Sequence, residues 1–158
     1  MDKNGYTLLE ILITISILAA TFAAGYTGFR EFSRRQAVNS VVNSVKSDLN
    51  LTQKQALDGK KPPTCDGGLI NYAFQVTSSN TYTISAKCTN SVLIKSVTLP
   101  SGITINPTPS PNPIEFKTIG QGTNITASPA SNYATFTILN SQINYSSQIT
   151  IGSNGEVN

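Results

Sequence analysis

The stretch Lys3-Asn4-Gly5-Tyr6-Thr7-Leu8-Leu9-Glu10 opens the chain, and residues 11–29, which follow it, contain no charged side chain. A helix rises about 1.5 Å per residue, so this apolar run is long enough to cross a hydrocarbon layer roughly 30 Å thick. Glu10 therefore lies inside a segment that enters a membrane, where an unpaired carboxylate costs about 2.5–3.5 kcal/mol. The sequence predicts an N-terminal membrane helix with one acidic side chain in need of a partner.

A partner for Glu10 arises if the chain is cut after Gly5. Cleavage there gives Tyr6 a new α-amine, which lies about one helical turn before Glu10. That amine keeps its proton at neutral pH, because its reference pKa is about 8. Glu10 can then pair with the Tyr6 amine of its own chain or with that of a neighbouring copy. The second pairing would order an assembly.

The N-terminal segment resembles the prepilin processing signature of type IV pilins and pseudopilins, through Gly5, the aromatic Tyr6, Thr7-Leu8-Leu9, Glu10 and the apolar helix. The resemblance implies that prepilin peptidase removes residues 1–5 as a leader and methylates the new amine of Tyr6. It also implies that Glu10 neutralises the N-terminus of a neighbouring subunit in a growing fibre. The chain departs from many family members by starting its mature part with Tyr instead of Phe.

Two other interpretations of this segment stay open. Residues 1–25 could be an ordinary secretory signal with a small-residue cleavage region at residues 23–25, although Glu10 would interrupt its apolar core. The segment could also be a plain single-pass anchor in which Glu10 is incidental.

Three arginines follow the apolar segment directly: Arg30, Arg34 and Arg35. Juxtamembrane cations attract anionic headgroups by about 1 kcal/mol each, so we expect these side chains at the membrane surface before assembly. The positive-inside rule would keep the body of the chain in the cytoplasm, because only Lys3 precedes the helix. The processing signature implies the opposite orientation, which we adopt: a single-pass membrane protein with a cytoplasmic N-terminus and a body outside the cell membrane.

A helical period continues through residues 30–61. Apolar side chains recur at spacings of three, four and seven: Val38, Val41, Val42, Val45, Leu49 and Ala56. Polar residues fill the other face: Asn39, Ser40, Asn43, Ser44, Lys46, Ser47 and Asp48. We expect one helix from Tyr6 to about Leu57, with a membrane half over residues 6–29 and an amphipathic half over residues 30–61. Gly59 would supply its C-cap.

Residues 62–158 change to β-branched and aromatic residues separated by turn formers, which predicts an antiparallel β-sheet domain. Strands are expected at residues 69–76, 82–88, 92–99, 114–117, 133–139 and 148–151, with a hairpin connection at residues 77–81. Four prolines predict an extended polyproline-like loop without ladder hydrogen bonds: Pro107, Pro109, Pro111 and Pro113. The expected fold is α+β and pilin-like, with the long helix packed on the sheet.

The two cysteines flank the predicted hairpin. Cys65 precedes its first strand and Cys88 ends the second, so antiparallel pairing would bring both to the open end of the hairpin. A disulfide there closes a loop of about 24 residues, worth roughly 3 kcal/mol on the chain-entropy model. Two free thiols are the alternative. We expect neither a metal site nor a cofactor, since two cysteines without histidine do not supply the four ligands of zinc.

The C-terminal half is similar to the body of GspH/FimT-like minor pilins, through strand-forming segments such as Ala134-Thr135-Phe136-Thr137-Ile138 and a closing glycine-containing hairpin. This resemblance implies a minor pilin or pseudopilin. Some FimT-like pilins bind DNA through arginines after the terminal glycine, whereas this chain reads Gly155-Glu156-Val157-Asn158. DNA is therefore a weakly supported partner.

We expect a structural subunit of a type IV pilus or a type II secretion pseudopilus. Its partners would be other pilin or pseudopilin subunits, prepilin peptidase, the inner-membrane assembly platform and, before assembly, membrane lipid. The alternative is a surface-anchored binding module for DNA uptake or adhesion, with the β-domain as receptor. An enzyme is not expected, because the chain has no histidine, Gly-x-Ser-x-Gly elbow or phosphate loop.

Overall fold

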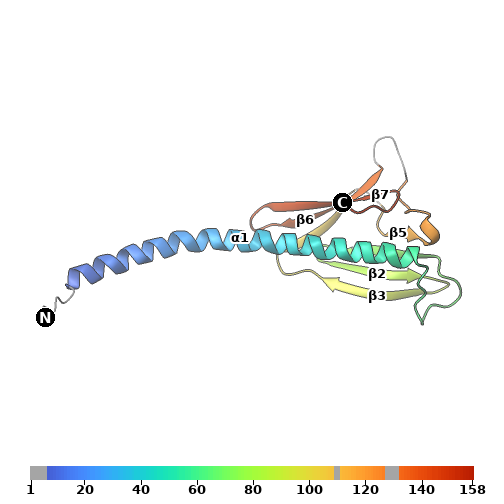
Figure 1. The fold of residues 1–158 in the computed structure, drawn as a ribbon, viewed down its shortest axis with the longest axis horizontal. Coiled ribbons are helices and arrows are strands. Elements are labelled where there is room, and N and C mark those ends of the chain that lie inside the picture. Colours follow the sequence, from blue (N-terminus) through green and yellow to red (C-terminus); the bar gives the residue numbers. More distant parts are fainter. Residues whose placement is uncertain (1–6, 109–110, 127–131) are drawn as a thin grey trace.

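The computed structural model describes residues 7–108, 111–126 and 132–158. A single helix, α1 (Leu8–Leu57), extends far beyond a body of two antiparallel sheets (Figure 1). The C-terminal half of α1 lies along both sheets, while its N-terminal half projects away from them. The predicted α+β fold, a long N-terminal helix packed on antiparallel β-structure, is confirmed, although the strands form two sheets where we expected one.

Both ends of α1 are capped. Thr7 is the N-cap, and its hydroxyl oxygen accepts a 3.3 Å hydrogen bond from the Glu10 backbone N–H. After the predicted end at Leu57, Gly59 adopts a φ of +58°, and the N–H of Lys60 donates back to the carbonyl of Gln55 over 3.0 Å. This left-handed turn is the glycine C-cap that the sequence predicted. The expected first helical residue, Tyr6, lies outside the described residues.

The strands divide into a four-stranded sheet in the order β3-β2-β1-β5 and a three-stranded sheet in the order β4-β6-β7. The first sheet contains β1 (Asn71–Ser78), β2 (Thr81–Lys87), β3 (Ser91–Thr98) and β5 (Ile114–Lys117). The second contains β4 (Ile103–Thr108), β6 (Tyr133–Asn140) and β7 (Tyr145–Gly152). A short 3-10 helix, η1 (Thr118–Gly120), follows β5. Each of the six expected strands overlaps an observed one, and β7 begins three residues earlier than expected.

Strand β4 corrects one prediction. Pro107 was expected in a loop without ladder hydrogen bonds, but it lies in β4 opposite Phe136 of β6. Proline is tolerated there because β4 is at the edge of its sheet, so the N–H that proline lacks is not required by a second neighbour. Pro111 and Pro113 do lie between β4 and β5, and Pro109 is outside the described residues.

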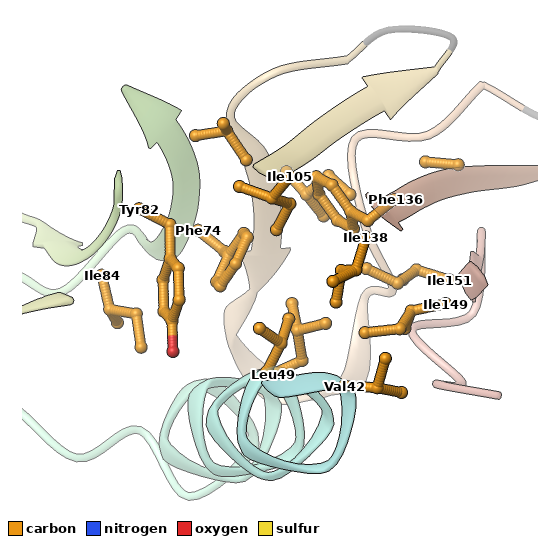
Figure 2. Close-up of a cluster of buried hydrophobic side chains, with 14 of the residues drawn as sticks. Val42, Leu49, Phe74, Tyr82, Ile84, Ile105, Phe136, Ile138, Ile149 and Ile151 are labelled. Carbon is orange, nitrogen blue, oxygen red and sulfur yellow. The ribbon is translucent and has the colours of Figure 1, made fainter. Parts of the chain in front are cut away.

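The core fills the space between the two sheets and α1 (Figure 2). All six apolar helix residues predicted for the buried face are buried: Val38, Val41, Val42, Val45, Leu49 and Ala56. Phe74 of β1 links the two sheets, because its ring stacks on Tyr82 at 4.9 Å and meets the edge of Phe136 of β6 at 5.3 Å. The body therefore holds the C-terminal half of α1 firmly and leaves the other half to project.

Candidate functional site

The N-terminal half of α1 projects away from the body (Figure 1), and its large apolar side chains are exposed. Its exposed large hydrophobic residues are Leu8, Leu9, Ile11, Leu12, Ile13, Ile15, Ile17, Leu18, Phe22, Tyr26, Phe29 and Phe32. By length and composition, α1 could cross a membrane. Exposed apolar surface on this scale marks a membrane or protein interaction site.

The polar side chains of this half are arranged for an apolar environment. Thr14 donates its hydroxyl to the carbonyl of Ile11, Ser16 to that of Leu12 and Thr21 to that of Leu18, each over 2.8 Å. These hydroxyl groups therefore find acceptors within the helix itself. Such internal pairing lowers the cost of placing Ser and Thr in hydrocarbon or in a packed helical bundle.

Glu10 is the acidic residue of the first turn of α1, and it is exposed. Its side chain lies near the positive end of the helix dipole. Within the described ranges, no cation lies within 4.0 Å of the Glu10 carboxylate, so it forms no ion pair there. The predicted cleavage and methylation residues, Gly5 and Tyr6, lie outside the described residues, and the predicted pairing with the Tyr6 amine stays a prediction.

The three arginines that follow the apolar segment do not form one cluster. Arg30 lies over the ring of Tyr26 at 5.7 Å, on the side of the projecting half. Arg35 pairs with Glu31 at 2.5 Å and lies over the ring of Tyr145 of β7 at 5.4 Å. Arg35 therefore ties the helix to the body at the point where the helix leaves it. Arg34 is half-buried.

Asp48 was expected on the polar face of the helix, and this prediction is wrong. The residue is 7% exposed, and its Oδ2 accepts a 2.7 Å hydrogen bond from the Tyr82 hydroxyl of β2. In Figure 2 that hydroxyl points toward α1. The Lys95 ammonium of β3 donates to both Asp48 oxygens at 2.7 and 2.8 Å. Because Asp48 lies three residues after buried Val45, it shares the buried face, and its charge is tolerated there because both oxygens are paired.

Burial and Asp48 together change the ionisation of Tyr82. Burial is the largest cause that raises the pKa of the Tyr82 phenol, and the hydrogen bond to Asp48 and the charge of Asp48 add to it. Tyr72, which donates its hydroxyl to the Lys60 carbonyl over 2.6 Å, also has a pKa raised by burial. Tyr82 thereby holds α1 to the first sheet, and Tyr72 holds the segment that follows α1 to the same sheet.

Cys65 and Cys88 form a disulfide with their Cα atoms 5.8 Å apart, and both residues are buried. The bond closes the open end of the β1–β2 hairpin, where the predicted strands placed the two residues. The neighbouring Asn90 side chain accepts from the Asp66 N–H over 2.9 Å and donates to the Thr64 carbonyl over 3.0 Å. The segment after the helix is thereby fixed against the end of β2.

Charges of the β-domain are largely neutralised in pairs. Of the three lysines in residues 62–158, Lys87 pairs with Glu115 and Lys95 with Asp48.

The C-terminus folds back on β7, with Thr150 and Asn158 exchanging two backbone hydrogen bonds of 2.9 Å. Among the described residues, no group of three or more acidic or cysteine side chains is placed to hold a metal ion.

Comparison with known proteins gives one match of low identity. The chain is 30% identical over 69 residues to prepilin peptidase-dependent protein D of Escherichia coli, which covers 43% of this chain. The chain spans about half the length of that relative, 47%. No protein-family model matches the chain, and no solved structure gives a significant match.

Proposed function

We propose that the chain is a structural subunit, a minor pilin or pseudopilin, of a type IV pilus or a type II secretion pseudopilus. The observation that carries this proposal is the projecting, exposed apolar half of α1 with Glu10 in its first turn. A body that buries one half of a helix and leaves the other bare is suited to anchoring in a membrane and then to packing in a helical bundle. The similarity to a protein named for its dependence on prepilin peptidase supports the same proposal.

In this mechanism, prepilin peptidase cuts between Gly5 and Tyr6 and methylates the new amine. The apolar side chains then leave the bilayer and pack against the helices of neighbouring subunits at the assembly platform. Glu10 loses its water in that bundle, and a buried carboxylate is tolerated only with a cation beside it. The Tyr6 amine of a neighbour supplies that cation and so sets the register between subunits. No catalytic step is assigned to the chain itself.

The proposed orientation places the N-terminus in the cytoplasm and the body outside the cell membrane. The disulfide between Cys65 and Cys88 supports this orientation, because disulfides persist in oxidising compartments and are rare in the cytosol. Arg30 and Arg34 would contact lipid headgroups before assembly. In the described parts of residues 62–158, the pairing of Lys87 and Lys95 with acidic residues leaves the β-domain little free positive charge for DNA, so we do not favour that domain as a DNA receptor.

The test is incorporation of a Glu10→Val variant, measured by mass spectrometry of the N-terminus in sheared surface filaments and in membranes of the native cells. We expect cleavage to be intact and incorporation to be lost. Glu31→Gln is the matched control, because Glu31 is an exposed carboxylate of the same helix outside its apolar segment. It should assemble normally.

Methylated Tyr6 in filaments of the unmodified chain would identify a pilus subunit, and methylated Tyr6 in membranes alone would identify a pseudopilin or low-copy initiator. Normal incorporation of Glu10→Val would overturn the charge-pairing mechanism. An intact Met1, or a start near Ala24, would overturn the proposed processing.

A further inference from the structure

Three polar side chains from three adjacent strands meet on one face of the four-stranded sheet. Tyr72 and Phe74 of β1 point into the core, so the alternating residues Asn71 and Ala73 point to the opposite face, away from α1. Asn71 lies directly opposite Lys87 of β2. Glu115 of β5 lies opposite Ala73, one step along the same face.

Glu115 bridges the other two side chains. Its Oε1 accepts a 2.5 Å hydrogen bond from the Lys87 ammonium, and its Oε2 accepts a 3.1 Å hydrogen bond from Nδ2 of Asn71. The carboxylate reaches across because Ala73, its neighbour on β1, is small. One carboxylate therefore holds the amine of Lys87 and the amide of Asn71 on its two oxygens.

The amide of Asn71 is buried, and its second polar atom has no partner. Asn71 is 8% exposed, whereas the side chains of Lys87 and Glu115 are 42% and 23% exposed above it. In the part of the chain that the structure describes, Oδ1 of Asn71 is the buried side-chain oxygen or nitrogen left without a hydrogen bond. Burying such an atom without a hydrogen bond is unfavourable, and a surface ion pair between Lys87 and Glu115 does not require it.

We propose that Lys87 and Asn71 form an intramolecular amide bond, with Glu115 as the group that moves the protons. An amine, a buried carboxamide and a carboxylate that contacts both are the parts that this exchange needs. General acid–base catalysis by a positioned carboxylate requires contact of this kind with the proton donor and the proton acceptor. The register of β1 and β2 supplies the proximity, which replaces the entropy cost of a bimolecular encounter.

The reaction balances without a redox partner. Glu115 takes a proton from the Lys87 ammonium, and the neutral Nζ attacks Cγ of Asn71 to form the Nζ–Cγ bond. Glu115 then delivers the proton to Nδ2, the Cγ–Nδ2 bond breaks, and ammonia leaves. Glu115 then passes the second Nζ proton to this ammonia, which becomes ammonium, and Glu115 returns to its carboxylate form. In total, Nζ gives up two protons and the leaving nitrogen gains two.

The new bond would join β1 to β2 directly beside the disulfide, since Lys87 precedes Cys88 in the chain. The hairpin would then stay closed whether or not the disulfide is reduced. This inference concerns the β-domain alone and does not depend on the proposed assembly function.

The test is the mass of the full chain, purified in detergent and reduced so that the disulfide does not alter the mass. We expect the wild-type chain to be lighter than its sequence by one molecule of ammonia, and tandem mass spectrometry of a digest to find Lys87 linked to Asn71. Lys87→Arg and Glu115→Gln should each restore the full mass.

Lys117→Arg is the matched control, because Lys117 also lies opposite Asn71, on the β5 side. It should keep the ammonia loss. A wild-type chain of full mass would overturn the proposal, whether or not the variants fold. An ammonia loss that persists in Lys87→Arg would also overturn it, because the loss would then come from another asparagine.

Discussion

The Tyr82 hydroxyl on β2 donates a 2.7 Å hydrogen bond to Oδ2 of Asp48 on α1, 34 residues away in the sequence. Lys95 of β3 completes the contact from the other side of the same carboxylate. These three groups connect the C-terminal half of the helix to two strands of the first sheet. They therefore help to set the direction in which the projecting half of the helix leaves the body.

We expect Asp48→Ala to lower the free energy of unfolding by about 1–3 kcal/mol, because the Tyr82 hydroxyl would be left buried without an acceptor. Lys95→Ala should cost a similar amount, about 1–3 kcal/mol, because Oδ1 of the Asp48 carboxylate, which is 7% exposed, would lose its donor while the charge stays buried. Chemical denaturation of the full chain in detergent micelles, followed by tyrosine fluorescence, measures both. No loss in Lys95→Ala would mean that the buried hydrogen bond to Tyr82, and not the ion pair with Lys95, is what Asp48 contributes.

The raised pKa of Tyr82 predicts a loss of stability at alkaline pH. The unfolded phenol ionises near its ordinary pKa of 10.0, while the folded phenol, held neutral by burial and by Asp48, keeps its proton to higher pH. Its contribution is therefore fully present below about pH 10 and is lost as the pH rises through the folded pKa. Tyr82→Phe should reduce the fall in the free energy of unfolding over this alkaline range, measured by chemical denaturation at a series of pH values.

Tyr133→Phe is the control for the removal of a phenol hydroxyl, since Tyr133 lies 52% exposed on β6. Tyr72 also makes the free energy of unfolding fall as the pH rises in the alkaline range, in every variant, because burial raises its pKa too. If the free energy of unfolding fell equally with alkaline pH in wild type and in Tyr82→Phe, the raised pKa of Tyr82 would not be its cause.

Two leucines of α1 allow a direct test of the buried face. Leu49 is fully buried, whereas Leu51, two residues further along the helix, is 50% exposed. Leu49→Ala should lower the free energy of unfolding by about 2–5 kcal/mol, because it removes buried methyl groups and leaves a cavity. Leu51→Ala should change it by less than about 0.5 kcal/mol. Thermal denaturation of both variants in the same detergent would show whether the buried face of α1 holds the helix to the body.

The helix and its buried face could be predicted because a period of 3.6 residues is a local property of the sequence. Val38 and Leu49 fall on the buried face for that reason alone. Asp48 was misplaced because a polar residue was assigned to the solvent face. Its burial depends on Tyr82 and Lys95, which only the folded sheet brings to it. Pro107 was misplaced because proline excludes a central strand but permits an edge strand, and edge position is not encoded locally.

The candidate functional residues could also be predicted only where the signal is local in the sequence. Glu10 could be identified from the sequence, because a lone carboxylate in an apolar run is informative by itself. The group of Asn71, Lys87 and Glu115 could not, since it depends on the pairing of β1 with both β2 and β5. Glu115 is 44 residues from Asn71 in the sequence. No spacing rule connects residues so far apart, and the contacts follow from strand register alone.

The disulfide and the proposed amide bond close overlapping loops, so their effects on stability are not additive. Cys65 and Cys88 are 23 residues apart, and a disulfide over that separation stabilises by roughly 3 kcal/mol on the chain-entropy model. An amide between Asn71 and Lys87 would already close most of this loop in the unfolded chain. Reduction of the disulfide should therefore cost roughly 3 kcal/mol in Lys87→Arg and clearly less in wild type, as measured by denaturation with and without a thiol reductant. Equal costs in the two chains would indicate that the disulfide is the only covalent closure of the hairpin.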